Sequence, residues 1–199
     1  MAVHSKLYLT PQQYLALERA SEERSEYLDG EMVAMTGVSR NHALIAVNLG
    51  RELSSQLLDR PCEVYASDLR VQVSPTGLYT YPDVVVVCGE PRFEDEQLDT
   101  LLNPTVLIEV LSPTTESYDR GKKFEHYRTL DSLAEYLLVS QDHPRIERYL
   151  RQNDGLWLFG DAAGLDAVLT LPSIGCDLRL AGVYAKVRFP GAETATPPS

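Results

Sequence analysis

Two apolar runs dominate the hydrophobic pattern of the chain and predict a buried sheet. Residues 84–88 and 105–111 are apolar segments of strand length, and a single acid interrupts the second one. Strands covered on both faces have such runs, whereas a strand with one face in water alternates between apolar and polar residues. We therefore expect these two segments to be neighbouring strands at the centre of a sheet.

Capping residues and helical periodicity predict three helices. Thr10 followed by Pro11 is typical of a helix start, and predicts a helix over 11–23. Ser39 is the expected cap of a second helix. The apolar stripe of that helix consists of His42, Ile45, Leu49, Leu53 and Leu57. A third helix is expected over 116–130.

Shorter strand signals complete the predicted fold. They cover 31–36, 62–66, 69–73 and 134–140, and a hairpin around Asn153-Asp154-Gly155 joins 145–151 to 156–160. The pattern predicts an α/β (α+β) fold with a mixed central β-sheet flanked by helices, an added N-terminal helix and strand, and a C-terminal hairpin. We expect one domain over 1–190 and a disordered tail over 191–199.

Composition and charge narrow the class of protein. A chain of 199 residues with 44% apolar and 24% charged residues fits one soluble domain, and excludes collagen, coiled coil and general disorder. The formal net charge of −11 argues against a protein that holds nucleic acid simply by coating its phosphates with cations. The chain shows neither a membrane-span pattern nor a signal-peptide pattern, so we expect a cytoplasmic protein without membrane contact.

The charges are unevenly distributed along the chain. Residues 61–111 carry nine acidic and two basic side chains, and five of these acids lie between 90 and 99, where we expect a solvated loop. Residues 112–151 carry seven cations, among them Arg120, Lys122 and Lys123. These cations are the expected contacts for a phosphate backbone, with binding that is sensitive to salt.

The three cysteines are an odd number without CxxC spacing. Cys62, Cys88 and Cys176 have no paired histidines nearby. The pattern therefore suggests neither a disulfide framework nor a zinc site, and we interpret all three as reduced core residues.

Glu109 is the acid within the second apolar run. Alternation along a strand puts Leu107, Glu109 and Leu111 on one face, so the carboxylate lies among apolar neighbours. Because burial of an unpaired charge is costly, Glu109 needs a partner, a proton or a metal. Asp83 opens the preceding strand directly after Pro82. In a structural interpretation, Asp83 caps a turn and Glu109 pairs with a cation. In the alternative interpretation, both acids bind Mg²⁺, which usually takes one or two carboxylates from a protein.

The helix predicted over 116–130 supplies a candidate lysine. At about 100° per residue, Lys123 lies about 40° from Tyr127 in the apolar stripe, whereas Lys122 lies about 140° from it. Lys123 should therefore face inward. Asp119 precedes Lys123 by four residues and lies on the same helix face. The two form either a surface pair worth a few tenths of a kcal/mol or part of a site.

Four ordered motifs between residues 81 and 139 carry a family resemblance. They are Tyr81-Pro82-Asp83-Val-Val-Val-Val, Val106-Leu-Ile-Glu109-Val-Leu-Ser112-Pro113, Asp119-Arg-Gly-Lys-Lys123-Phe-Glu-His-Tyr127 and Glu135-Tyr136-Leu-Leu-Val139. Together they resemble the Uma2 family of endonucleases (DUF820), in the PD-(D/E)XK nuclease superfamily, and the resemblance extends over nearly the whole chain to about Pro190.

The resemblance implies a restriction endonuclease-like core and a metal site. Asp83, Glu109 and the backbone carbonyl of Val110 would bind Mg²⁺ or Mn²⁺. The superfamily places its catalytic lysine two residues after the glutamate, where this chain has Leu111. The resemblance therefore implies that the lysine lies on the following helix, at Lys123.

The implied activity is metal-dependent endonuclease cleavage of DNA phosphodiester bonds. The expected supporting residues are Glu26, His42, Asp119 and Tyr127. A salt bridge within the N-terminal hairpin remains an alternative for Glu26, and a satisfied core histidine remains one for His42. A non-catalytic scaffold that keeps the fold, or a metal-dependent hydrolase of another phosphate ester, remains an alternative function. Nuclease-like relatives often pair about a two-fold axis, so a homodimer is a further expectation.

Overall fold

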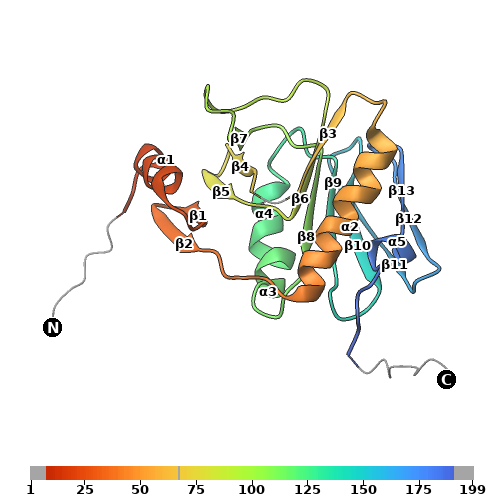
Figure 1. The fold of residues 1–199 in the computed structure, drawn as a ribbon. Coiled ribbons are helices and arrows are strands. Elements are labelled where there is room, and N and C mark those ends of the chain that lie inside the picture. Colours follow the sequence, from red (N-terminus) through yellow and green to blue (C-terminus); the bar gives the residue numbers. More distant parts are fainter. Residues whose placement is uncertain (1–7, 67, 191–199) are drawn as a thin grey trace.

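A mixed six-stranded sheet forms the centre of the molecule (Figure 1). The computed structural model describes residues 8–66 and 68–190, so the tail expected over 191–199 lies outside the described residues. The strands, in spatial order, are β11 (Trp157–Ala163), β10 (Arg145–Arg151), β9 (Glu135–Val139), β8 (Val106–Val110), β6 (Val84–Cys88) and β3 (Cys62–Ala66). β8 and β9 are parallel and the other neighbours antiparallel, which confirms the predicted mixed sheet.

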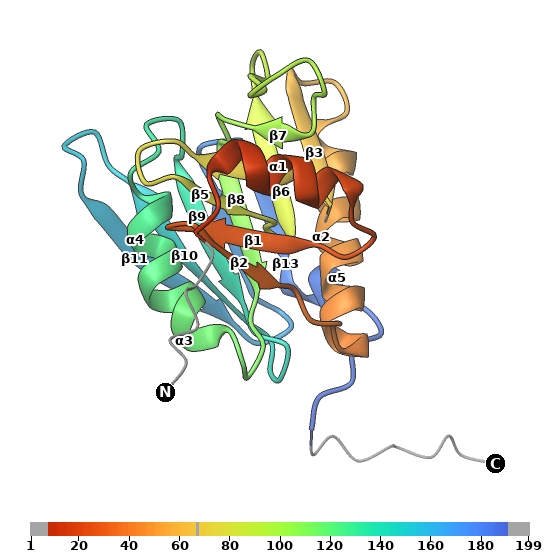
Figure 2. The same ribbon diagram turned by 90° about the vertical axis from the view of Figure 1, so that its left-hand side faces the viewer.

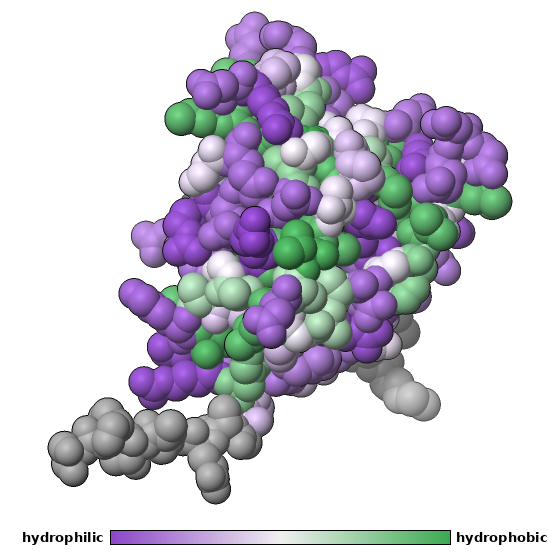
Figure 3. Space-filling model, turned by 90° about the vertical axis from the view of Figure 1, so that its right-hand side faces the viewer, coloured by the Kyte–Doolittle hydropathy of each residue, from purple (hydrophilic) through white to green (hydrophobic). Residues whose placement is uncertain are grey.

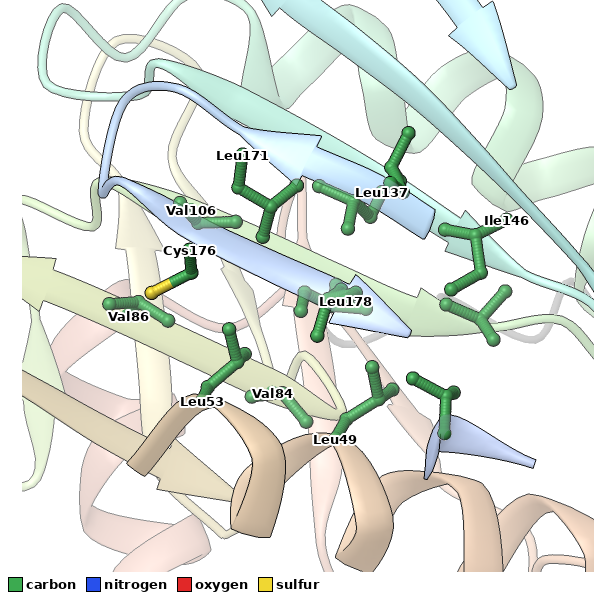
Figure 4. Close-up of a cluster of buried hydrophobic side chains, with 14 of the residues drawn as sticks. Leu49, Leu53, Val84, Val86, Val106, Leu137, Ile146, Leu171, Cys176 and Leu178 are labelled. Carbon is green, nitrogen blue, oxygen red and sulfur yellow. The ribbon is translucent and has the colours of Figure 1, made fainter. Parts of the chain in front are cut away.

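The two apolar runs are neighbouring central strands, as predicted. β6 and β8 pair with Val84 opposite Ile108, and every residue of β8 is buried. Helix α2 (Arg40–Leu57) covers one face of the sheet, and all five residues of its predicted stripe are buried. Figure 4 shows Leu49 and Leu53 of α2 directed at Val84 and Val86 of β6. The Ser39 side chain accepts a hydrogen bond from the His42 amide, so the predicted cap is confirmed.

A helical segment covers the opposite face of the sheet. It consists of α3 (Glu116–Tyr118), a π-helical turn η1 (Asp119–Lys123) and α4 (Phe124–Tyr127), within the range predicted for one helix. The Phe124 and Tyr136 rings stack at 5.5 Å between this segment and β9. Single π-helical turns inside helices are frequent at functional sites.

The N-terminal addition is larger than the sequence predicted. Helix α1 (Pro11–Ala20) lies over a second sheet in Figure 2. Its strands, in spatial order, are β2 (Glu31–Ala34), β1 (Ser25–Leu28), β5 (Leu78–Thr80), β4 (Arg70–Val73) and β7 (Thr100–Leu101). The rings of Tyr14, Tyr27 and Tyr79 pack together beneath α1. β1, β5 and β7 were not predicted, although β2 and β4 lie within the strands predicted over 31–36 and 69–73.

The C-terminal region also contains more than the predicted hairpin. β12 (Val168–Leu171), β13 (Cys176–Arg179) and α5 (Leu180–Val183) follow β11. Leu171 and Leu178 of these strands complete the core beside α2, as Figure 4 shows.

On the face seen in Figure 3, hydrophilic residues surround scattered hydrophobic patches. No helix within the described residues 8–66 and 68–190 is long and apolar enough to cross a membrane.

The interpretation of all three cysteines as reduced is wrong for two of them. Cys62 and Cys88 are paired across β3 and β6 and form a disulfide, with Cα atoms 4.0 Å apart. The pairing of β3 with β6 brings the two sulfur atoms together. The spacing of the cysteines in the sequence does not indicate this disulfide. Cys176 is free and buried, as expected.

The acidic segment between 90 and 99 is not simply a solvated loop. Arg19 of α1 forms ion pairs with Asp95 and Asp99, each at 2.8 Å. The buried Arg70 of β4 also contacts Asp99, at 2.9 Å. Glu94 also accepts a hydrogen bond of 2.7 Å from Tyr79 of β5, so three of the five acids tie the loop to α1 and the second sheet.

Candidate active site

Strand register brings Asp83 and Glu109 together. Val84, the first residue of β6, stands opposite Ile108, so Asp83 directly before β6 lies near Glu109, and both residues line the same cavity. The Asp83 Oδ2 atom accepts a hydrogen bond of 2.7 Å from the Val110 amide, which orients the carboxylate. Two acids on adjacent strands, predicted from the apolar pattern, thus form one site.

Lys123 lies at the centre of this site. Its Nζ atom is 3.0 Å from Glu109 Oε1, 3.1 Å from Glu26 Oε1 and 3.6 Å from Asp119 Oδ1. Lys123 is 6% exposed, whereas Lys122 is exposed, so the predicted inward orientation is confirmed. Glu26 comes from β1 of the second sheet, and it pairs with this lysine across the sheets instead of within its own hairpin.

Two hydroxyl groups orient the carboxylates from the buried side. The fully buried Tyr127 donates a hydrogen bond of 2.7 Å to Glu109 Oε1. Burial, together with the charge of Glu109, raises the pKa of Tyr127 well above its usual value, so this phenol is a neutral donor. The Thr80 hydroxyl donates to Glu26 Oε1 from the end of β5. Thr80 was not singled out from the sequence, although it lies three residues before Asp83.

His42 completes the set of predicted residues. It lies in the first turn of α2, and its Nε2 atom is 3.2 Å from Asp83 Oδ2. The ring is 8% exposed. His42 is therefore both a buried residue of the helix stripe and a contact of the candidate site.

The site contains more negative than positive charge. Three carboxylates contact Lys123, namely Glu109, Glu26 and Asp119, and the charge of Asp83 acts on Glu109. Burial raises the pKa of Glu109 above its usual value, and although Lys123 opposes this shift, the charges of Asp119 and Asp83 add to it. Burial alone would lower the pKa of Lys123, but the neighbouring carboxylates raise it well above its usual value. The lysine is therefore a fixed cation.

A cavity of about 860 Å³ connects these groups. All the predicted residues except Tyr127 line it, and so do Tyr118 of α3 and Gln141, which follows β9. The Gln141 side chain donates a hydrogen bond of 2.9 Å to the Leu111 carbonyl, so it links the ends of β8 and β9. Sequence analysis missed both residues. An uncharged polar residue at the carboxyl end of a parallel strand was the available signal for Gln141.

Arg120 and Arg145, two of the seven cations of residues 112–151, contact carboxylates of their own chain. Arg120 pairs with Glu116 at 2.8 Å and also contacts the buried Glu147. Arg145 contacts Asp161 at 3.0 Å and Glu147 at 3.4 Å. These arginines mainly neutralise carboxylates of their own chain.

The fold defines an α/β protein with a mixed central sheet flanked by helices. A crystal structure from Anabaena variabilis, described as a "putative nuclease belonging to DUF820", has the same fold with a TM-score of 0.70. The two chains are 20% identical, and the comparison covers 88% of this chain and 97% of the other.

Within this class the chain belongs to the Uma2 family. The family model, described as "Putative restriction endonuclease", matches residues 11–181. Two uncharacterized proteins of Synechocystis sp. are similar over most of their length. Protein sll1609 is 37% identical over 84% of this chain and 94% of its own, and slr1290 is 39% identical over 91% and 94%.

Proposed function

We propose that this protein is a metal-dependent endonuclease that hydrolyses phosphodiester bonds of DNA. One observation carries the proposal: Asp83, directly before β6, and Glu109 of the neighbouring strand β8 line one cavity of about 860 Å³, with Lys123 Nζ 3.0 Å from Glu109. Membership of a family described as restriction endonucleases supports this reading of the site.

The residues of the site fit a bound Mg²⁺ or Mn²⁺. No group of three His, Cys, Asp or Glu side chains among the described residues has the arrangement of a metal cage. Mg²⁺ does not require three such protein ligands, because it usually binds one or two carboxylates and keeps several water ligands. Asp83, Glu109 and the Val110 carbonyl would hold the ion. The excess of carboxylates over cations in the site favours an additional positive charge.

Hydrolysis adds one water molecule across a P–O bond. The water oxygen bonds to phosphorus, the bond to the leaving oxygen breaks, and the products are a phosphomonoester and an alcohol. A bound Mg²⁺ supplies a Lewis acid that polarises the phosphoryl oxygen and lowers the pKa of water.

The protein's own groups orient and stabilise the reacting phosphate. Lys123 keeps its proton, so it acts as a positive charge beside the phosphate and not as a base. Tyr127 and the Val110 amide hold Glu109 and Asp83 in position through hydrogen bonds. His42 restrains Asp83 from the side of α2.

The proposal is tested by cleavage of supercoiled plasmid and of a labelled DNA strand in Mg²⁺, Mn²⁺ or EDTA. We expect cleavage only with metal, and loss of cleavage in Asp83→Asn, Glu109→Gln and Lys123→Met. Glu125→Gln is the matched control, because Glu125 is exposed on the same helical segment as Lys123 and has no role in the proposed site. Titration calorimetry with Mn²⁺ should show weaker binding to the Asp83 and Glu109 variants. Cleavage that survives all three substitutions would refute the proposal.

A further inference from the structure

Three exposed apolar side chains border the cavity beside the carboxylates. Val33, Met35 and Val38 are 64%, 43% and 59% exposed. They lie on the end of β2 and on the segment that leads to α2, and all three line the same cavity as Asp83 and Glu109. We call these three residues the apolar wall. Apolar groups left in water next to a polar site commonly contact a ligand.

The cavity has little positive charge for a nucleic acid duplex. Six carboxylates line it, whereas Lys123 is the one lysine or arginine among its described lining residues. Lys123 is already engaged by three of these carboxylates. Arg120 is paired with Glu116 and Glu147 and does not supply the missing charge. A duplex presents two phosphates per base pair, and its binding depends on many cations.

The size and the lining of the cavity suit a single nucleotide unit. A volume of about 860 Å³ lies within the range of about 300–1,000 Å³ that is common for sites of drug-sized ligands. A base has an apolar face whatever its sequence, so an apolar surface binds unpaired bases with little sequence preference. In a duplex these faces are stacked on neighbouring base pairs and do not reach such a wall.

We propose that the cavity accepts an unpaired nucleotide of single-stranded DNA, with its base on the apolar wall and its phosphodiester at Asp83, Glu109 and Lys123. The inference rests on the proposed nuclease function and specifies its substrate class. Binding energy comes from the base face at Val33, Met35 and Val38, which reduces the number of phosphate contacts that the acidic site must provide.

The test compares binding of fluorescein-labelled oligo(dT) with binding of the same strand paired to oligo(dA). Fluorescence anisotropy in Ca²⁺ reports binding without the need for turnover. We expect the single strand to bind at least roughly 10-fold more tightly than the duplex. The variant Val33→Thr/Met35→Gln/Val38→Thr should weaken single-strand binding by roughly 10-fold, because it removes apolar contact and preserves side-chain size.

A matched control uses an exposed apolar residue away from the cavity. Val47 on α2 is 67% exposed and does not line the cavity, so Val47→Thr should leave binding unchanged. Unchanged thermal unfolding of the triple variant confirms that it is folded. In cleavage assays with Mn²⁺, the triple variant should raise KM for oligo(dT) and leave kcat within about two-fold.

The outcomes separate this inference from the proposed function. Equal or tighter binding of the duplex, or a triple variant that binds like the wild type, overturns the inference. Wall-dependent binding of the single strand without hydrolysis under any metal condition contradicts the nuclease function and leaves the recognition of single strands standing. Hydrolysis with a preference for duplex contradicts the present inference alone.

Discussion

Replacement of Lys123 by methionine should destabilise the folded protein strongly. The ammonium is 6% exposed and lies 3.0–3.6 Å from Glu109, Glu26 and Asp119. Methionine preserves much of the length of the side chain and removes the charge, so three carboxylates lose their common cation. Removal of one partner from a buried ion pair typically costs about 3–5 kcal/mol. We expect a loss of that size in the free energy of unfolding.

The measurement is urea denaturation at neutral pH in EDTA. The control is Lys122→Met, which changes the neighbouring exposed residue and should alter the free energy of unfolding by less than about 0.5 kcal/mol. Addition of Glu109→Gln to Lys123→Met removes one of the unpaired charges and should restore about 1–3 kcal/mol. A Lys123→Met variant as stable as Lys122→Met would show that the carboxylates are not held together by this lysine.

Two further predictions concern the disulfide and the acidic loop. The Cys62–Cys88 bond closes a loop with a sequence separation of 26, so Cys62→Ser/Cys88→Ser should lose about 3–4 kcal/mol. Thiol titration of the unfolded, unreduced wild-type protein should find only Cys176, and three free thiols would contradict the bond. The hydrogen bond from Arg19 holds the pKa of Asp99 below its usual value, so its stabilisation is present above the unfolded pKa of about 3.9 and is lost as the pH falls through the lower folded pKa. Asp99→Asn should cost about 1 kcal/mol at neutral pH, because the carboxylate is partly screened by water. In urea denaturation this difference should shrink as the pH falls from about 5 through the unfolded pKa toward the lower folded pKa, and a difference independent of pH would contradict the pairing.

Local pattern was sufficient to locate the parts of the site that lie on regular elements. The unbroken apolar runs identified β6 and β8, and alternation along β8 placed Glu109 on the face opposite to Val110. The helical angle between Lys122 and Lys123 separated the exposed lysine from the buried one. These inferences succeeded because periods of 2 and 3.6 residues follow directly from backbone geometry.

The sequence pattern could not predict contacts between residues that are far apart in the chain. The disulfide depends on Cys62 and Cys88 occupying opposite positions of β3 and β6, and the ion pairs of the 90–99 loop depend on the proximity of α1. The role of Glu26 depends on how the second sheet meets the first. None of these contacts has a periodic signal, because the partners are far apart in the sequence.

By itself, the sequence determined the central strands, the helix faces and two buried charges of the site, Glu109 and Lys123, because each follows from local spacing and from the cost of burying polar groups. The tertiary structure alone decided which charges meet. It assembled Glu26 and Asp119 around Lys123, engaged Arg120 with carboxylates of its own chain, and exposed Val33, Met35 and Val38 on the wall of the cavity. Electrostatic and apolar contacts depend on distances across the fold, which strand register and packing establish.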